Sequence, residues 1–235
     1  MCLEMEADCV LENTDQALAF FKHWQATDPH HGYLALCFDV CHQAVVFEDC
    51  YQSLQRLLDA RVPVGKIQLS NALICQLPFA DRPRRQQVLQ ALGNFAEATY
   101  LHQVKARDMA GQLLAWADLP GALDAAEPAQ GQCPELRIHF HVPLFSEQFL
   151  LAELSGSQQA LLRTFDFLAA HPNFQPVLEV ETYSWNVLPG ALRPDSEQAL
   201  LQGIAAELQW VEGQLRQRHL LRTHSSALEA PAHAF

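Results

Sequence analysis

The chain has 235 residues, 49% of them hydrophobic and 18% charged, which is an ordinary globular composition with enough length for one sizeable core. A formal net charge of −12 disfavours nucleic acid as a partner, because Lys and Arg side chains supply most of the affinity for phosphate backbones. No apolar run approaches the about 20 residues of a membrane helix, and Glu4, Glu6 and Asp8 stand where a secretion signal would be basic, so we expect a cytoplasmic protein without membrane insertion.

The first part of the chain alternates strand-like and helix-like segments. The sequence predicts a strand at 1–6, a helix that begins at Asn13-Thr14-Asp15, a strand at 32–39, a helix through 47–58 and a strand at 64–70. Helical segments of this length between strands favour parallel strands over hairpins.

The remaining elements include an insertion at 99–134. We predict a helix at 83–97, a hairpin from 100–106 and 111–116, a short helix from Asp118, and a loop at 127–134. A strand at 136–142, a helix at 157–170, a strand at 176–182 and a long helix from about 194 follow. The expected buried stripe of that last helix consists of Leu201, Ile204, Leu208, Val211 and Leu215. Residues 223–235 show no sustained period and are expected to be disordered.

Alternate residues of five strands are rich in acids, amides and imidazoles, and their neighbours are apolar. The polar-face positions are Cys2 and Glu4; Ala35, Cys37 and Asp39; Lys66, Gln68 and Ser70; Arg137, His139 and His141; Val177, Glu179 and Glu181. Successive strand side chains point to opposite faces, so each strand has one apolar side and one side that ends in metal-ligand or acid/base groups. A half-solvated antiparallel sheet is the alternative, but it usually has short turns between its strands. We therefore predict a parallel barrel or an open parallel sheet.

The strongest candidate site residues lie near the ends of the last two strands. His139 and His141 share a face, and neutral imidazole is a frequent ligand for zinc, manganese or iron. The alternative is hydrogen-bonded packing of these rings against Glu179. Glu179 and Glu181 also share a face and would repel one another unless a cation lies between them. Glu181 is nearer the carboxyl end of its strand, so we assign it to a metal and Glu179 to a supporting role.

Further candidates lie at the ends of earlier strands. Asp39 and His42 stand where a strand gives way to a loop, although such a pair alone more often has a surface or core role, because Asp commonly caps helices and His is often a hydrogen-bonded core residue. Glu4 is the matching carboxylate of the first strand. His102 belongs to the insertion and is a candidate to fold over the mouth.

Seven cysteines without a secretion signal predict reduced thiols rather than a disulfide framework. Cys37 and Cys41 flank Asp39, but no CxxC pair accompanies them. We expect both to be small core residues.

Several segments together resemble a known family. They are Leu3-Glu4-Met5-Glu6, Cys9-Val10-Leu11-Glu12, Asp39-Val-Cys-His42, Lys66-Ile-Gln-Leu-Ser70, Tyr100-Leu-His-Gln-Val104, His139-Phe-His-Val-Pro143 and Glu179-Val-Glu-Thr-Tyr-Ser-Trp185. They look like the EboE-type metabolite traffic proteins of the xylose-isomerase-like superfamily, from the first residue to about Val211. The resemblance implies an incomplete TIM-type (β/α) barrel over residues 1–222, comprising about strands 4 to 8. It also implies that the first strands are missing through a late start or are supplied by another chain.

The resemblance implies a divalent metal site for Mn, Zn or Mg. Its ligands would be Glu4, Asp39, Gln68 and Glu181, with His42, His139 and His141 as further ligands or substrate contacts. The sugar epimerases and endonucleases of the superfamily usually present histidine at position 68, so Gln68 is a departure from their pattern. Lys66, His102 and Glu179 are expected substrate contacts.

The function that the resemblance implies is Ebo-type metabolite traffic, with metal-dependent isomerase or epimerase chemistry on a small hydroxycarbonyl or sugar-like metabolite. Glu4 and Glu181 would exchange the proton. One alternative is a non-catalytic binding or hand-over protein in a secondary-metabolite export system, with other Ebo-cluster proteins as partners. A second alternative is metal-dependent phosphodiester hydrolysis, which the acidic composition disfavours.

Overall fold

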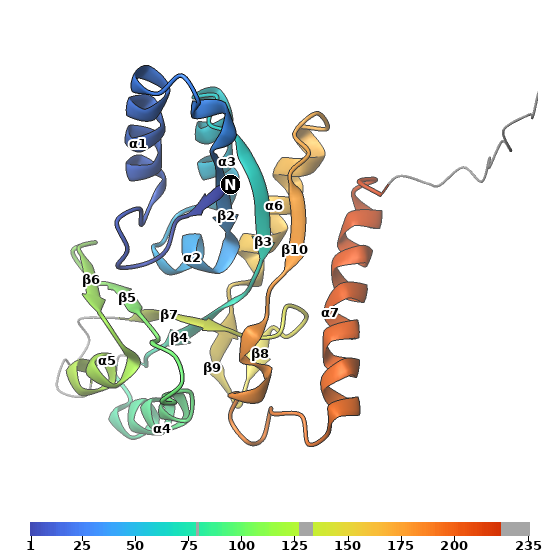
Figure 1. Cartoon of the computed structure of the whole chain (residues 1–235). Helices are drawn as coiled ribbons and strands as arrows, with labels where there is room; N and C mark the ends of the chain where they lie inside the picture. Colours follow the sequence, from blue (N-terminus) through green and yellow to red (C-terminus); the bar gives the residue numbers. More distant parts are fainter. Residues whose placement is uncertain (79, 127–133, 222–235) are drawn as a thin grey trace, which may run out of the picture.

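The computed structural model describes residues 1–78, 80–126 and 134–221, and it confirms a mixed α/β fold built on two sheets (Figure 1). The parallel sheet has the order β1-β2-β3-β10 and comprises β1 (Cys2–Glu4), β2 (Ala35–Asp39), β3 (Val64–Leu69) and β10 (Val177–Val180). The antiparallel sheet has the order β6-β5-β7-β4-β9-β8 and comprises β4 (Ala72–Gln76), β5 (Val104–Arg107), β6 (Leu113–Trp116), β7 (Glu135–His141), β8 (Gln148–Phe149) and β9 (Leu151–Gly156).

Four helices pack on the apolar face of the parallel sheet. They are α1 (Thr14–Thr27), α3 (Cys50–Asp59), α6 (Gln158–Ala170) and α7 (Glu197–Gln217). Each contributes buried side chains to one core that also contains Phe38 of β2 and Ile67 of β3. The predicted period-two alternation is confirmed here, because Leu36, Phe38, Ile67 and Leu69 all enter this core.

Side-chain caps fix where these helices begin. Asn13 accepts a hydrogen bond from the Gln16 amide at 3.0 Å, which confirms the predicted start of α1. Asp39 caps the short helix α2 (Val40–Val45) in the same way, so its carboxylate is held at the end of β2.

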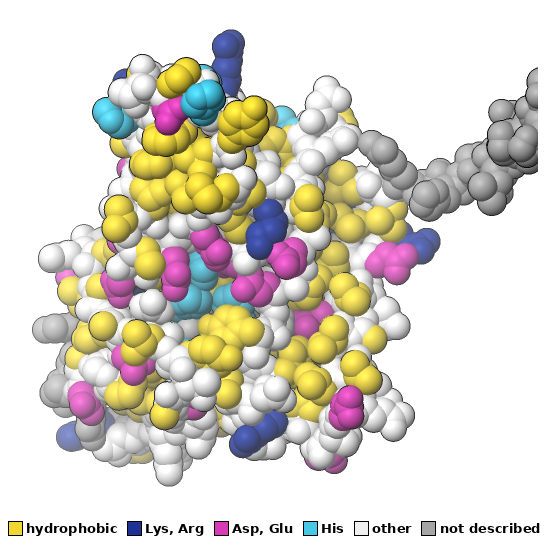
Figure 2. Space-filling view, in the orientation of Figure 1, with side chains coloured by type: hydrophobic (Ala, Val, Ile, Leu, Met, Phe, Trp, Pro, Cys, Tyr) yellow, Lys and Arg dark blue, Asp and Glu magenta, His cyan; other side chains and the backbone are white. Residues whose placement is uncertain are grey.

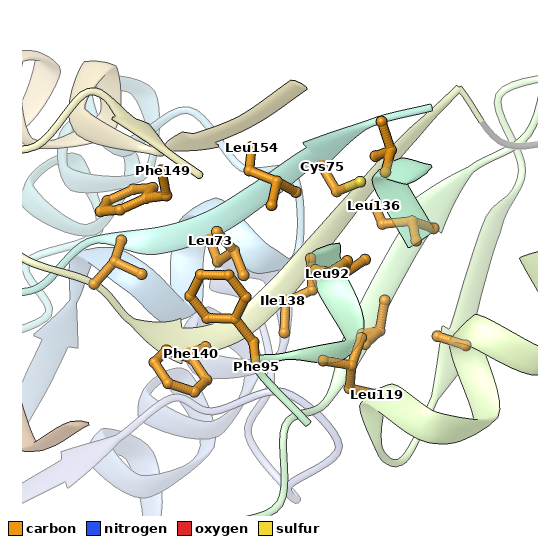
Figure 3. Close-up of a cluster of buried hydrophobic side chains, with 14 of the residues drawn as sticks. Leu73, Cys75, Leu92, Phe95, Leu119, Leu136, Ile138, Phe140, Phe149 and Leu154 are labelled. Carbon is orange, nitrogen blue, oxygen red and sulfur yellow. The ribbon is translucent and has the colours of Figure 1, made fainter. Parts of the chain in front are cut away.

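The antiparallel sheet has its own core, which α4 (Arg82–Gly93) and α5 (Leu119–Ala126) help to cover (Figure 3). Alternate residues Leu136, Ile138 and Phe140 of β7 enter this core. Phe140 meets Phe95 edge to face, with ring centroids 5.2 Å apart. The opposite face of β7 therefore carries His139 and His141, as the alternation predicts.

The expectation that the strand at 136–142 is parallel is wrong. β10 pairs directly with β3, with Val177 opposite Lys66, whereas β7 pairs antiparallel with β4 and β5. The reason is β4, an apolar strand that closely follows β3 and was not predicted from the sequence. The strands β8 and β9 were not predicted either. The predicted hairpin of the insertion is confirmed as β5 and β6, which extend this second sheet. Most of the predicted loop at 127–134 lies outside the described residues.

Two helix predictions also need correction. Phe47 has a φ of 63° and separates α2 from α3, so no single helix spans 47–58. In α7, Leu201 is 60% and Leu208 54% exposed, whereas Val211 is 7% exposed. The ring of Trp185 packs so closely on Gly203 of this helix that a Cβ there would lie 2.6 Å from it.

The parallel sheet does not close into a barrel within the described residues. None of the helices in these ranges is both long and apolar enough to cross a membrane. The tail at 223–235, which is predicted to be disordered, lies outside the described residues.

Candidate metal and proton-transfer site

The carboxyl ends of the parallel strands meet the antiparallel sheet at one cluster of ionisable side chains. Glu4 ends β1, Asp39 ends β2, and Glu181 directly follows β10. A carboxylate oxygen from each of these three residues lies within 4.8 Å of the others. Acidic and histidine side chains gather near the centre of the face shown in Figure 2. This edge is where parallel α/β sheets place their ligands.

Three buried histidines complete the cluster. His42 comes from α2, and His139 and His141 come from β7. Their ring centroids lie 4.4 Å apart for His42 and His139, 5.9 Å for His42 and His141, and 5.4 Å for His139 and His141. The two sheets thus contribute opposite sides of one site.

Each imidazole is oriented by a hydrogen bond from its Nδ1 atom. The acceptors are the Met5 carbonyl oxygen for His42 at 2.9 Å, the Gln103 side-chain oxygen for His139 at 2.8 Å, and the Glu181 carbonyl oxygen for His141 at 2.9 Å. An Nδ1 atom that donates leaves Nε2 as the atom available to a ligand. Metal-binding histidines in proteins are commonly held in this way.

The Nε2 atoms of His42 and His139 are 2.9 Å apart, so a proton or another cation must lie between them. The nitrogen of His42 that approaches the carboxylates is Nδ1, which lies 3.4 Å from Glu4 and 3.7 Å from Asp39. The Nε2 atom of His141 is buried and has no hydrogen-bond partner among the described residues, and the same is true of Glu181 Oε2. Buried polar atoms rarely remain unpaired, so these two atoms fit a site that takes a cation.

Burial and like charges shift the pKa values of the acids. Burial, with Asp39 and Glu4 nearby, raises the pKa of Glu181 to about 7. Burial is also the main cause that raises the pKa of Glu4, which His42 partly offsets. The expected repulsion between carboxylates is therefore present, but Glu181 feels it from Asp39 and Glu4 rather than from Glu179.

The pKa of one histidine of the cluster is raised, and the pKa values of the other two are lowered. Burial opposes the charged form of His42, but Asp39 and Glu4 outweigh it and the pKa of this ring is raised. Burial lowers the pKa of His139 well below its usual value and that of His141 to about 4. Both β7 histidines are therefore neutral near pH 7, the form in which imidazole binds metals.

Asp39 is held firmly between the two sides of the site. Its carboxylate is fully buried and accepts hydrogen bonds from the His42 amide at 2.7 Å and the Ser70 hydroxyl at 2.8 Å. Such fixed oxygens are suited to hold a cation in place.

Three expected ligand or substrate residues lie beside the cluster on the polar face of the sheet. The side-chain oxygen of Gln68 accepts a hydrogen bond from the Cys37 thiol at 2.8 Å. Lys66 and Glu179 form an ion pair with a nitrogen–oxygen distance of 2.6 Å. Glu179 thus pairs with Lys66 rather than with the histidines.

His102 does not reach into the cluster. It is fully buried, its Nδ1 atom donates to the His139 carbonyl oxygen at 3.1 Å, and its Nε2 atom lies 3.1 Å from the Glu97 carboxylate. It supports the β7 backbone, so the geometry favours a structural role over the expected substrate contact.

Two residues that the sequence reading did not assign to the site lie at its edge. Cys41 is fully buried in the first turn of α2, and its thiol lies within 4.8 Å of ring nitrogens of His139 and His141. Tyr183 follows β10, and its ring centroid lies 4.6 Å from that of His141. The position of Cys41 between Asp39 and His42 was the available signal for the first of these.

Comparison of the chain with protein-family models, with curated protein sequences and with solved structures found no match. The resemblance to the xylose-isomerase-like superfamily therefore remains a prediction, and the assignment of function depends on the geometry of the site.

Proposed function

We propose that the chain binds a divalent metal ion in this cluster and is a metal-dependent isomerase or epimerase of the EboE type, acting on a small hydroxycarbonyl or sugar-like metabolite. The observation that carries the proposal is the arrangement of the three imidazoles. Each is tethered at Nδ1, and ligand atoms of His42 and His141 lie within 4.8 Å of Asp39, which itself belongs to the group of Glu4, Asp39 and Glu181. Neutral imidazole and carboxylate together are typical ligands of zinc and manganese.

The residues present fit such an ion. One ligand atom each from Asp39, His42 and His141 lies within 4.8 Å of the other two, as for the three carboxylates. The unpartnered atoms His141 Nε2 and Glu181 Oε2 come from residues of these same groups. A divalent ion bound here would polarise the carbonyl of a substrate and acidify the neighbouring C–H bond.

Glu181 and Glu4 would then move the proton. A general base works best when its pKa lies near the working pH, and that of Glu181 is raised to about 7. Glu181 would take the proton from the substrate carbon, and Glu4 would return one at the adjacent position. Lys66 lies close enough to lower the pKa of both Glu4 and Glu181. Its ammonium group would orient a hydroxyl of the substrate.

We further propose that the parallel sheet is part of a xylose-isomerase-like barrel, corresponding to strands 4 to 8. Its four helices share one face, whereas a doubly wound sheet carries helices on both faces. β1 and β10 are the outer strands, so in a flat sheet three spacings of about 4.8 Å would separate them by about 14 Å. Carboxylates of Glu4 and Glu181 that approach within 4.8 Å therefore favour a sheet curved toward its polar face.

Closing the barrel would require further strands against the outer edges of β1 and β10. A partner chain is one source of them. In this proposal, helices added with those strands would cover the exposed apolar side chains Leu201, Ile204 and Leu208 of α7.

A non-catalytic binding or hand-over role is the second candidate. It is favoured by Gln68, a neutral residue whose side-chain oxygen is already engaged by Cys37. With one ligand position weakened, the site could bind a metal and metabolite without turning the metabolite over.

Exchange of substrate protons separates the two candidates. The chain is stripped of metal, reloaded with Mn²⁺, Zn²⁺ or Mg²⁺, and incubated in D₂O with a panel of aldoses, ketoses and small hydroxyketones. Isomerase chemistry predicts metal-dependent deuterium incorporation next to the carbonyl, seen by proton NMR, that is lost in Glu181→Gln and kept in Glu212→Gln, a change on the exposed side of α7. Thermal stabilisation by a compound without exchange would support the hand-over role. A chain that shows neither effect would refute both.

A further inference from the structure

We propose that Cys41, His139 and His141 form a sulfur-containing subsite that binds a thiophilic divalent ion, Zn²⁺, at the imidazole end of the cluster. The inference deepens the proposed function and rests on the cluster being a metal site. Its geometric basis is direct, because the Cys41 thiol and one ring nitrogen from each histidine lie within 4.8 Å of one another. All three side chains are buried.

A second observation points to the same ligand. His141 is 1% exposed, its Nδ1 atom is committed to the Glu181 carbonyl, and its Nε2 atom has no hydrogen-bond partner among the described residues. That lone pair is the group an incoming cation would engage first. The Nδ1 atom of His139 is hydrogen-bonded to Gln103, and its Nε2 atom, 2.9 Å from that of His42, would exchange this contact for the ion.

The position of Cys41 is determined by the same network that holds Asp39. The backbone amide of Cys41 donates to the Ser70 hydroxyl at 2.8 Å, and that hydroxyl donates to Asp39 at 2.8 Å. The thiol is therefore held at the end of β2, beside the rings supplied by β7. A preorganised thiol needs little rearrangement to become a ligand.

The surroundings of other cysteines differ from those of Cys41. Cys50 and Cys75 belong to the two apolar cores, Cys37 donates to Gln68, and Cys2 and Cys9 are exposed. Within the described part of the chain, the clusters with metal-ligand spacing include one thiol, that of Cys41. The others therefore provide matched controls.

The subsite divides the cluster by ligand chemistry. Thiolate and imidazole select zinc, whereas Mg²⁺ prefers oxygen ligands such as those of Glu4 and Glu181. As the sulfur–zinc bond forms, the Cys41 thiol releases its proton to solvent. Three protein ligands leave a position for substrate or water, which is the pattern of catalytic zinc sites. Glu4 and Glu181 then remain free to transfer protons.

Zinc-edge X-ray absorption of the full chain tests the inference. Metal-stripped protein reloaded with Zn²⁺ should show one sulfur neighbour at about 2.3 Å beside nitrogen or oxygen neighbours at about 2.0–2.1 Å. Cys41→Ser should lose the sulfur neighbour and weaken zinc binding at least about tenfold. Cys50→Ser should keep both.

The outcomes distinguish failure of the Cys41 subsite from failure of the proposed function. Zinc bound by nitrogen and oxygen alone would overturn the role of Cys41 and leave the histidine–carboxylate site standing. Failure of the wild-type chain to retain any divalent ion would overturn both. If Cys41→Ser does not fold, each of the other six cysteines of the sequence, Cys133 included, is changed singly to serine. A sulfur neighbour that persists in all of them supports Cys41, and its loss in any one of them contradicts the assignment.

Discussion

The Nδ1 atom of His141 donates a hydrogen bond to the backbone carbonyl oxygen of Glu181 at 2.9 Å. This bond joins β7 of the antiparallel sheet to the residue that follows β10 of the parallel sheet. The Glu181 amide in turn donates to the Leu69 carbonyl at 3.1 Å, so the segment after β10 is held on both sides. The site therefore exists only where the two sheets are docked.

Glu207 of α7 is expected to be the main anchor of that docking. Its buried carboxylate accepts hydrogen bonds from the Leu144 amide, the Thr182 hydroxyl and the Trp185 indole. Glu207→Ala should lower the free energy of unfolding by about 3 kcal/mol, because three donors lose their acceptor. Urea denaturation measures this loss. Glu212→Ala, on the exposed side of the helix, should change it by less than about 0.5 kcal/mol, and equal losses would contradict the anchoring role.

The pH dependence of the unfolding free energy should reflect the raised pKa of Glu207. Burial raises the pKa of Glu207, so above about pH 4.3 the folded state holds a proton that the unfolded state releases. The contribution of this group is therefore fully present at low pH and is lost as the pH rises through the folded pKa. The stability of the wild type relative to Glu207→Gln should decrease as the pH is raised. A difference that stays constant or grows would show that the pKa is not raised.

The orientation of α7 predicts opposite effects for two residues three positions apart. Leu208 is 54% exposed and Val211 is 7% exposed. Val211→Ala should cost about 1–3 kcal/mol of unfolding free energy, whereas Leu208→Gln should change it by less than about 0.5 kcal/mol. Thermal and urea unfolding of the two variants compare them. A larger loss for Leu208→Gln would mean that this flank of the helix is covered.

The sequence predicted the elements of the parallel sheet and the shared faces of their residues, since both follow from local patterns. Helix caps at Asn13 and the alternation around Phe38 and His139 are of this kind. The direction of β7 could not be predicted, because a period of two is the same in parallel and antiparallel strands. Its place depends on pairing with β4, which is distant in sequence.

Two features of the site and its surroundings depended on long-range packing. Cys41 was expected to be a core residue because thiols are often buried without a ligand role. Its approach to His139 and His141 arises only when β7 docks on α2. The orientation of α7 likewise involves contacts of Trp185 and Glu207, so helical spacing alone was right for Val211 and Leu215 but wrong for Leu201 and Leu208.

Metal content is the measurement that tests the central claim most directly. The chain is purified, stripped with a chelator, dialysed against Zn²⁺ or Mn²⁺ and then against metal-free buffer, and its metal is counted by mass spectrometry. The cluster of three tethered imidazoles with Glu4, Asp39 and Glu181 predicts at least about one retained ion per chain. The retained metal should fall substantially in His141→Gln and stay unchanged in Glu212→Gln. A wild-type chain that retains no more metal than His141→Gln would contradict the account.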